Sequence, residues 1–196
     1  NADVNLVKTH NMNTIANGTV LIPNEVTRSA IYVLRNPLDM VLSYAKHFGQ
    51  THEQAATAIC NKKNALVGDQ VFTGSFISRW ADHVESWTSH KPYPVLTLRY
   101  EDMMNDPVTA FGKALDHLGL PVESERLSRA IRHSSFEELR KQEQDQGFIE
   151  SSSVSDVGFF RQGKAGHWRD ELDLELAGMI RKANSRAMKR FRYYET

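Results

Sequence analysis

The apolar residues 30–34 run directly into Arg35-Asn36-Pro37, and this junction constrains the fold more than any other part of the chain. The apolar run predicts a buried parallel strand, because strands covered on both faces are continuously apolar. Asn36 is a preferred helix cap and Pro37 suits the first helical position, so a helix should begin there at once. The sequence therefore predicts a strand, a tight turn and a helix, the unit from which α/β proteins are built.

Arg35 stands where this strand should end and the helix should begin. A guanidinium in that place is suited to bind an anion, because it offers a bidentate fork and the helix amino terminus adds positive potential. Ser43 lies about two turns into the helix and could give a hydroxyl to the same anion. The pattern predicts a phosphate-binding turn, with an arginine that pairs with a nearby carboxylate as the alternative.

The rest of the chain alternates between strand and helix patterns. Asp106 and Pro107 repeat the cap-and-proline start of a helix. We expect one domain over residues 1–196 with an α/β fold, a parallel sheet flanked by helices, and ligands at the carboxyl ends of the strands. The expected strands are residues 4–8, 29–34 and 94–99, the expected helices are residues 37–48, 52–64, 75–88, 107–119, 122–133, 135–144 and 172–188, and residues 142–156 are an expected loop.

Composition narrows the classes of partner. Lysine plus arginine and aspartate plus glutamate each number 24, so the net charge is zero. This balance argues against a broad nucleic-acid or membrane-binding surface, but it leaves room for a local anion pocket. No apolar run approaches the length of a membrane span, and no metal-ligand spacing is present. Cys60 is the single cysteine, which fits a reducing compartment and an expected cytoplasmic location.

Lys8 and His10 close the first expected strand. Side chains two residues apart on a strand point to the same side, so both should face one site. His10 could act as a general base near neutral pH, and Lys8 could neutralise charge on a transferred group. A histidine that is simply exposed at a strand end is the alternative.

A basic loop with two glycines, residues 161–169, follows the aromatic pair Phe159 and Phe160. The glycines let backbone amides approach an oxyanion, and the lysine and arginine side chains supply charge. The aromatic pair could give a stacking surface for a nucleotide base. The alternative is a flexible basic loop beside two phenylalanines of the core.

Taken together, these segments resemble the cytosolic-type sulfotransferases, which transfer a sulfuryl group from 3′-phosphoadenosine-5′-phosphosulfate (PAPS) and release adenosine 3′,5′-bisphosphate (PAP). Lys8-Thr9-His10 looks like the family's Lys-Thr-His segment, and residues 35–43 match its Arg-Asn-Pro-x-Asp-x-x-x-Ser motif. Residues 74–87 are similar to its Gly-Ser-Trp…His-Val…Trp helix. The resemblance implies a P-loop-like sulfotransferase fold, with His10 as the catalytic base and Lys8 assisting at the sulfuryl group.

Three later segments extend the resemblance along the chain. Residues 100–103 match the family's Tyr-Glu-Asp-Met step, and residues 134–136 resemble its Ser-Ser-Phe. Residues 159–169 look like its Phe-x-Arg-Lys-Gly-x-x-Gly-Asp-Trp-Lys signature. The residues that the resemblance assigns to the nucleotide are Arg35, Ser43, Tyr100, Ser134, Phe136, Phe159, Phe160, Arg161, Gln162 and Gly163.

The chain also departs from the family pattern. The family's phosphosulfate-binding loop, Pro-Lys-x-Gly-Thr-Thr-Trp, and the strand before it have no counterpart in this sequence. We expect the chain to be a piece of a longer protein; a gene that lacks this segment is the alternative. Gln162 replaces a lysine and His167 an aspartate of the signature, and both changes should weaken the hold on the nucleotide.

The function implied by the resemblance is transfer of a sulfuryl group from PAPS to a hydroxyl or amine of a small-molecule acceptor, with no metal. The alternative is a degenerate module that binds the 3′-phosphoadenosine nucleotide and transfers nothing. The walls of the acceptor site are expected in residues 11–22 and 142–156, because these segments adjoin the motifs.

Overall fold

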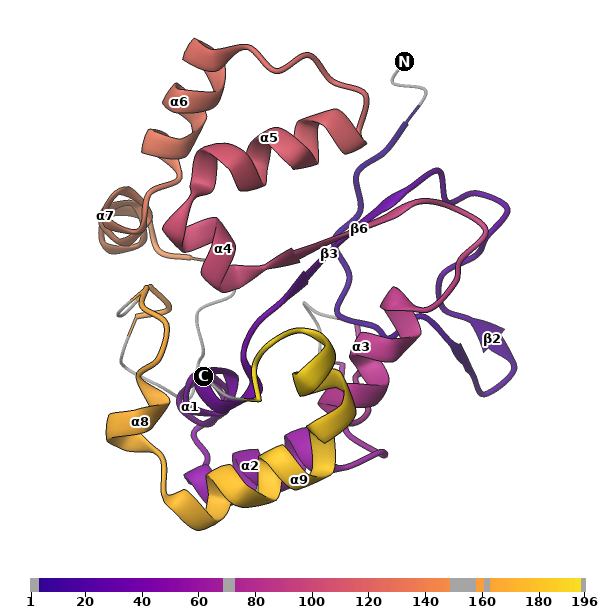
Figure 1. Cartoon of the computed structure of the whole chain (residues 1–196), viewed down its shortest axis with the longest axis vertical. Helices are drawn as coiled ribbons and strands as arrows, with labels where there is room; N and C mark the ends of the chain where they lie inside the picture. The colour runs from indigo at the N-terminus through magenta and orange to yellow at the C-terminus, as the bar shows by residue number, and fades with distance from the viewer. Residues whose placement is uncertain (1–3, 69–72, 149–157, 161–162, 195–196) are drawn as a thin grey trace.

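A computed structural model of the chain describes residues 4–68, 73–148, 158–160 and 163–194. The elements follow one another from an N-terminal hairpin to a long C-terminal helix (Figure 1). The strands are β1 (Ile15–Ala16), β2 (Thr19–Val20), β3 (Ala30–Leu34), β4 (Ala65–Leu66), β5 (Ser75–Phe76) and β6 (Val95–Arg99), and the helices are α1 (Pro37–His47), α2 (His52–Cys60), α3 (Trp80–Thr88), α4 (Tyr100–Asn105), α5 (Pro107–His117), α6 (Ser124–His133), α7 (Phe136–Gln146), α8 (Trp168–Glu171) and α9 (Leu174–Arg190).

The centre of the fold is the parallel pair β3 and β6. Ala30 pairs with Val95 at one end of this ladder and Leu34 pairs with Arg99 at the other. Helices α4 to α7 lie to one side of the pair, and α1, α2, α3 and α9 lie to the other (Figure 1). The predicted α/β architecture, a parallel sheet flanked by helices, is therefore confirmed.

Two helix starts form as their sequences predict. Asn36 caps α1 by accepting a hydrogen bond from the Leu38 amide at 3.0 Å, and proline occupies the first turn. Asp106 caps α5 by accepting from the Thr109 amide at 3.1 Å, again before a proline. In both cases the cap satisfies an amide that the helix itself leaves without a partner.

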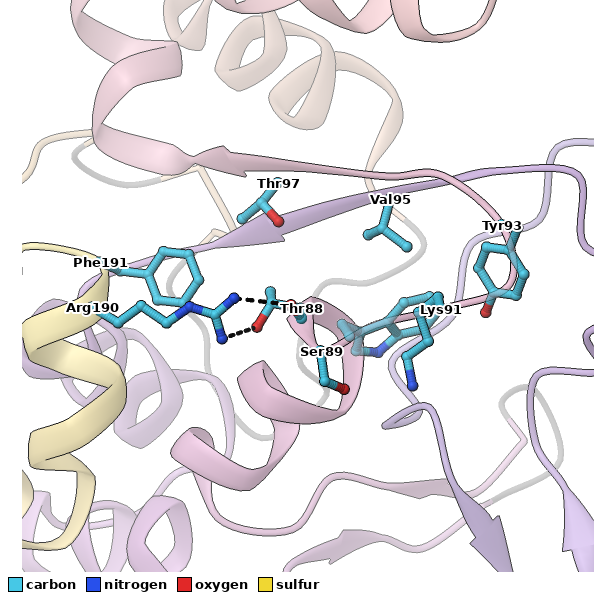
Figure 2. A pocket seen from close by; sticks show the side chains of 9 residues that line it. Thr88, Ser89, Lys91, Tyr93, Val95, Thr97, Arg190 and Phe191 are labelled. Atoms are coloured by element: carbon cyan, nitrogen blue, oxygen red, sulfur yellow. Dashed lines mark hydrogen bonds between the residues drawn. The ribbon is translucent and has the colours of Figure 1, made fainter.

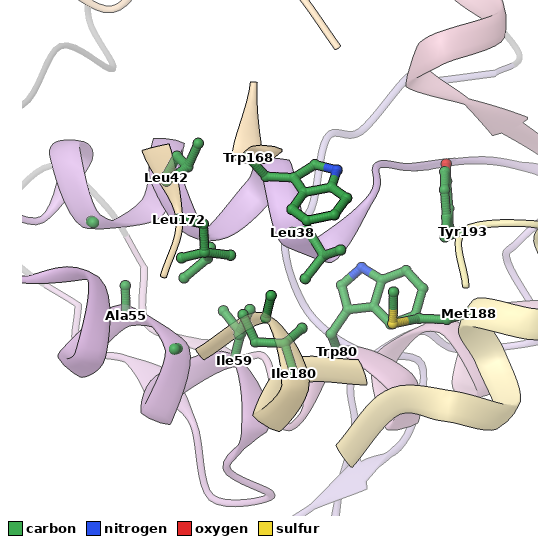
Figure 3. Packing of buried hydrophobic residues seen from close by; sticks show 14 of the residues in the cluster. Leu38, Leu42, Ala55, Ile59, Trp80, Trp168, Leu172, Ile180, Met188 and Tyr193 are labelled. Carbon is green, nitrogen blue, oxygen red and sulfur yellow. The ribbon is translucent and has the colours of Figure 1, made fainter. Parts of the chain in front are cut away.

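The main core lies between the helices on the α9 side of the sheet. Leu38 of α1, Val84 of α3 and Ile180 of α9 have no exposed surface. Figure 3 shows these helices directing apolar side chains at one another, with Trp168 and Leu172 packed among them. This packing fixes α1, and with it the turn at Arg35, against the rest of the molecule.

Replacing Ile180 by alanine is expected to lower the free energy of unfolding by about 3 kcal/mol, because it leaves a cavity in a close-packed core. Val108→Ala on α5 is the matched control, because that side chain is 55% exposed and should cost under about 0.5 kcal/mol. Denaturant unfolding of the two variants measures the difference. Equal losses would show that the α9 interface is not packed as described.

The strand expected at residues 4–8 is wrong. Residues 5–10 have no regular secondary structure, and Leu6 and Val7 are 86% and 84% exposed. A strand needs a neighbour for its backbone groups, and apolar residues alone do not supply one. Within the described part of the chain, β3 and β6 pair only with each other, so this segment has no ladder to join.

The helix expected at residues 75–88 is wrong in its first turns. Ser75 and Phe76 form β5, antiparallel to β4, and α3 begins only at Trp80. The reason is a long-range contact: the Asn64 carbonyl accepts hydrogen bonds from the Ile77 and Ser78 amides at 3.1 and 2.8 Å. The apolar period was correct, but these bonds hold the chain extended until the helix starts.

Other boundaries shift by a few residues. Helix α2 ends at Cys60, because the Asn61 side chain accepts from the Lys63 amide and turns the chain. Helix α9 starts after Asp173, which caps it, and α7 extends into the expected loop as far as Gln146. In the ranges that the structure describes, no helix combines the length and the apolar character needed to cross a membrane.

Candidate active site

The parallel register of β3 and β6 brings Arg35 and Tyr100 together. Each follows the last residue of its strand, and those last residues, Leu34 and Arg99, are paired. The guanidinium carbon of Arg35 lies 4.5 Å from the centroid of the Tyr100 ring. This cation–π contact holds a positive charge at the carboxyl edge of the sheet, where α/β proteins bind ligands.

Two further contacts orient the Arg35 guanidinium. One terminal nitrogen donates to the Ser43 hydroxyl at 3.1 Å, and the other donates to the Lys164 carbonyl at 3.1 Å. Its Nε is buried, and among the described atoms it has no hydrogen-bond partner. The structure thus joins Arg35 to Ser43 as the spacing predicts, and it adds the glycine-containing loop to the same group.

Asp39 fastens this loop to helix α1. Its carboxylate accepts hydrogen bonds from the Gly166 amide at 2.8 Å and from the Trp168 amide at 3.1 Å. The side chain is only 2% exposed, so both bonds form away from water. Sequence reasoning missed this role, because an acidic residue in the first turn of a helix also fits a simple interaction with the helix dipole.

The three phenylalanines predicted to contact the nucleotide gather into one cluster. Phe159 and Phe160 lie 5.1 Å apart between ring centroids, and Phe148 lies 4.9 Å from the first and 5.0 Å from the second. Phe136 meets Phe160 edge to face at 6.1 Å. Glu143 of α7 accepts from the backbone amides of Phe159 and Phe160, which ties the cluster to that helix. Phe148 was missed, because it lies in a mostly polar stretch outside the motifs.

Gly163 fits tightly against this cluster. Its φ is +57°, and an added Cβ would lie 2.5 Å from the Phe136 ring. Gly163→Ala should therefore displace that ring and weaken, about tenfold, the nucleotide binding that the family resemblance implies. Gly119→Ala is the matched control, since φ is +68° there with nothing within 4 Å of the Cβ. Calorimetric titration of both variants with PAP measures the effect. Equal binding by the two would mean that the contact with Phe136 does not matter.

Three other residues are predicted to bind the nucleotide, and the structure describes only one of them. Ser134 lies exposed at the end of α6, and its hydroxyl donates to the Ala130 carbonyl at 2.8 Å. The structure therefore shows this hydroxyl engaged with its own helix. Arg161 and Gln162 lie outside the described residues.

Lys8 and His10 are exposed, in a segment that is anchored through its backbone. The His83 imidazole contacts the His10 carbonyl through Nε2 at 3.2 Å and the Tyr32 hydroxyl through Nδ1 at 2.9 Å. Burial lowers the pKa of His83, so the ring is neutral at pH 7. A carbonyl can only accept, so Nε2 carries the proton and the Tyr32 hydroxyl donates to Nδ1. His10 is thereby fixed to β3 and α3.

A separate pocket of about 180 Å³ opens between α3, β6 and the end of α9 (Figure 2). Lys91 and Tyr93 lie toward one end of it, and Arg190 points at Thr88; Trp87 also lines the pocket. The Arg190 guanidinium is already used, since it donates to the Thr88 hydroxyl at 3.1 Å and to the Thr88 carbonyl at 2.9 Å. None of the predicted site residues lines this pocket.

Metal ligands do not gather in the described part of the chain. No group of three or more histidine, cysteine, aspartate or glutamate side chains there could hold a metal ion. The candidate site consists instead of a cation on an aromatic ring, a hydroxyl, a glycine-containing loop and an aromatic cluster.

Comparison with known proteins agrees with this geometry. The family described as "Sulfotransferase domain" matches residues 3–192. The chain is 26% identical to Sulfotransferase 2A1 of Rattus norvegicus over 165 residues, which cover 82% of the chain and 57% of the relative. It is 31% identical to Sulfotransferase 1 family member D1 of Mus musculus over 148 residues, 72% of the chain and 48% of the relative. The chain thus spans about half the length of these curated relatives.

A solved structure shows the same fold. The crystal structure of retinol dehydratase in complex with androsterone and inactive cofactor PAP superposes with a TM-score of 0.66 at 23% sequence identity. The match covers 87% of this chain and 50% of that one. The predicted sulfotransferase fold is confirmed, and because the family match spans nearly all of the sequence, the chain belongs to the sulfotransferase family.

Proposed function

We propose that the group around Arg35 binds the 3′-phosphate of PAPS or PAP, and that the protein transfers the sulfuryl group of PAPS to a hydroxyl or amine of a small-molecule acceptor. One observation carries this proposal: the Arg35 guanidinium, oriented by Ser43 and stacked on Tyr100, stands at the carboxyl edge of a parallel sheet beside the amino terminus of α1. A bidentate donor beside a helix amino terminus is matched to a phosphate.

The other predicted residues are proposed either to bind the nucleotide or to take part in the sulfuryl transfer. The proposed hold on the nucleotide extends from the Arg35 group to the loop at Gly163 and to the aromatic cluster. Asp39 fastens the loop to α1, the helix that also carries Ser43, and Glu143 fastens the cluster to α7. The cluster offers aromatic faces for an adenine. Arg161, Gln162 and Ser134 are carried in this proposal by the family resemblance alone.

PAPS is a substrate here, and it supplies the sulfuryl group. His10 accepts the proton of the acceptor while the acceptor oxygen or nitrogen forms a bond to sulfur. The bond between sulfur and the bridging oxygen of the 5′-phosphate breaks, and Lys8 stabilises the charge that grows on that oxygen. Arg35 and Ser43 keep the nucleotide in place throughout, so positioning and electrostatics carry the reaction.

The partners and the cellular location are proposed from the contacts beside His10 and from the composition. A small-molecule acceptor is proposed, with walls that include residues 11–13, because Asn11 and Asn13 are fastened to α3 beside His10. The zero net charge supports the proposal that neither nucleic acid nor membrane is a partner. Cys60 is not in a disulfide, which supports a cytoplasmic location. The core that α1, α2, α3 and α9 share supports a single domain.

The alternative is a module that binds the 3′-phosphoadenosine nucleotide without transferring sulfate. It is favoured by one observation: His10, the proposed base, is exposed and lies in a segment without regular secondary structure. Incubation of the protein with sulfur-labelled PAPS and a panel of phenols, alcohols and amines separates the two. Labelled product supports transfer, and PAP binding without product from any acceptor supports the module.

A further inference from the structure

Glu101 joins the ends of the two central strands to the C-terminal segment. One carboxylate oxygen accepts a hydrogen bond from the Asn36 amide at 2.9 Å. The other accepts from the Tyr193 hydroxyl at 2.6 Å. A single side chain therefore bridges the turn after β3, the start of α4 and the residues that follow α9.

The Tyr193 end of this bridge is buried in the core. Tyr193 is 1% exposed, and the Arg99 guanidinium lies 4.5 Å from its ring centroid. Burial, reinforced by the hydrogen bond to Glu101, raises the pKa of the Tyr193 hydroxyl, which therefore keeps its proton and donates it at all physiological pH values. The Trp80 ring, at 6.2 Å, fixes Tyr193 within the core.

Glu101 and the residue whose amide it binds, Asn36, each lie next in sequence to a residue of the proposed phosphate site. Glu101 follows Tyr100 in the chain, and Asn36 follows Arg35. Holding the Asn36 amide and the first turn of α4 on one carboxylate fixes the backbone on which the Arg35 guanidinium and the Tyr100 ring are mounted. Losing the hydrogen bond from Tyr193 frees Glu101, and with it that backbone, without removing any group that would touch the ligand.

We propose that Tyr193 and Glu101 are positioning residues for the 3′-phosphate site, which hold Arg35 over Tyr100 so that the guanidinium meets the 3′-phosphate of an adenosine nucleotide. This inference rests on the proposed function of the Arg35 group. It makes the segment that follows α9 part of the nucleotide site, although none of the side chains of that segment need touch the nucleotide.

Tyr193→Phe tests the inference, because it removes the hydroxyl and keeps the ring beneath Arg99. Tyr194→Phe is the matched control, the same change one residue on, in a ring that stacks with Lys189. Both variants and the wild-type protein are titrated calorimetrically with PAP and with adenosine 5′-monophosphate, which lacks the 3′-phosphate. All titrations are made well below the lowest melting temperature. Glu101→Gln serves as a second variant if Tyr193→Phe does not fold.

The expected result is about tenfold weaker binding of PAP by Tyr193→Phe with unchanged binding of adenosine 5′-monophosphate, and no change in Tyr194→Phe. Equal weakening toward both nucleotides would overturn the inference, since a merely structural role does not select the 3′-phosphate. Unchanged PAP binding would overturn it as well.

A second readout in the nucleotide-free protein separates this inference from the proposed function. The nuclear Overhauser contact between the Arg35 side chain and the Tyr100 ring should be present in the wild-type protein and lost in Tyr193→Phe. A contact that persists in the variant would overturn the positioning role. Loss of the contact, together with a wild-type protein that does not bind PAP, would contradict the proposed function and still support the positioning role.

Discussion

Replacing Arg35 by alanine is expected to weaken PAP binding about a hundredfold. The change removes a bidentate donor to the phosphate, and two charge-assisted hydrogen bonds together contribute roughly 3 kcal/mol. It also removes the cation from the Tyr100 ring and a donor from Ser43. Calorimetric titration of the variant with PAP, beside the wild-type protein, measures the loss.

Two further variants show whether the loss of PAP binding comes from the planar guanidinium of Arg35 itself. Arg35→Lys keeps the charge but not the planar fork, so it should fall between the wild-type protein and the alanine variant. Arg126→Ala removes another arginine, one that is paired with Glu123 on the exposed face of α6, and should leave binding unchanged. If Arg35→Ala and Arg126→Ala weaken binding equally, the proposed phosphate site is wrong.

Replacing His10 by alanine is expected to lower the turnover rate about a thousandfold and to leave PAP binding nearly intact. A positioned general base contributes between about a hundredfold and ten thousandfold to proton transfer. The backbone carbonyl that anchors this segment to His83 remains in the variant, so the segment should stay in place. Turnover with labelled PAPS and PAP titration of the same preparation give the two quantities.

His90→Ala is the control for that prediction, because His90 is also exposed and lies outside the candidate site, just beyond α3. It should leave both turnover and PAP binding at the wild-type values. If His10→Ala loses PAP binding in proportion to turnover, the role of His10 is structural and the proposed chemistry of this residue is contradicted.

Local signals in the sequence predicted much of the fold. Asn36-Pro37 and Asp106-Pro107 are each enough to predict a helix start, since each capping side chain accepts a hydrogen bond from an amide within three residues. The same locality explains why Arg35 and Ser43 could be paired, because the turn at Asn36 and the first two turns of α1 fix their separation. That Arg35 also meets Tyr100 follows once the two apolar strands are paired in parallel.

Hydrogen bonds between residues far apart in the chain could not be predicted from local sequence patterns. Nothing near residues 75–78 in the sequence indicates that the Asn64 carbonyl will accept two of their amides and delay the helix. Asp39 likewise reaches the amides of Gly166 and Trp168 more than 120 residues away. The error at residues 4–8 has the opposite cause: an apolar pattern without a partner strand does not form a strand.

Calorimetric titration of this chain with PAP and with adenosine 2′,5′-bisphosphate tests the central claim most directly. The two ligands carry the same base and charge and differ only in the position of one phosphate. A site built on Arg35, Ser43 and Tyr100 predicts micromolar binding of PAP, at least about tenfold tighter than the 2′ isomer. Equal affinity for the two isomers, or no binding of either, would contradict the claim that this turn recognises a 3′-phosphate.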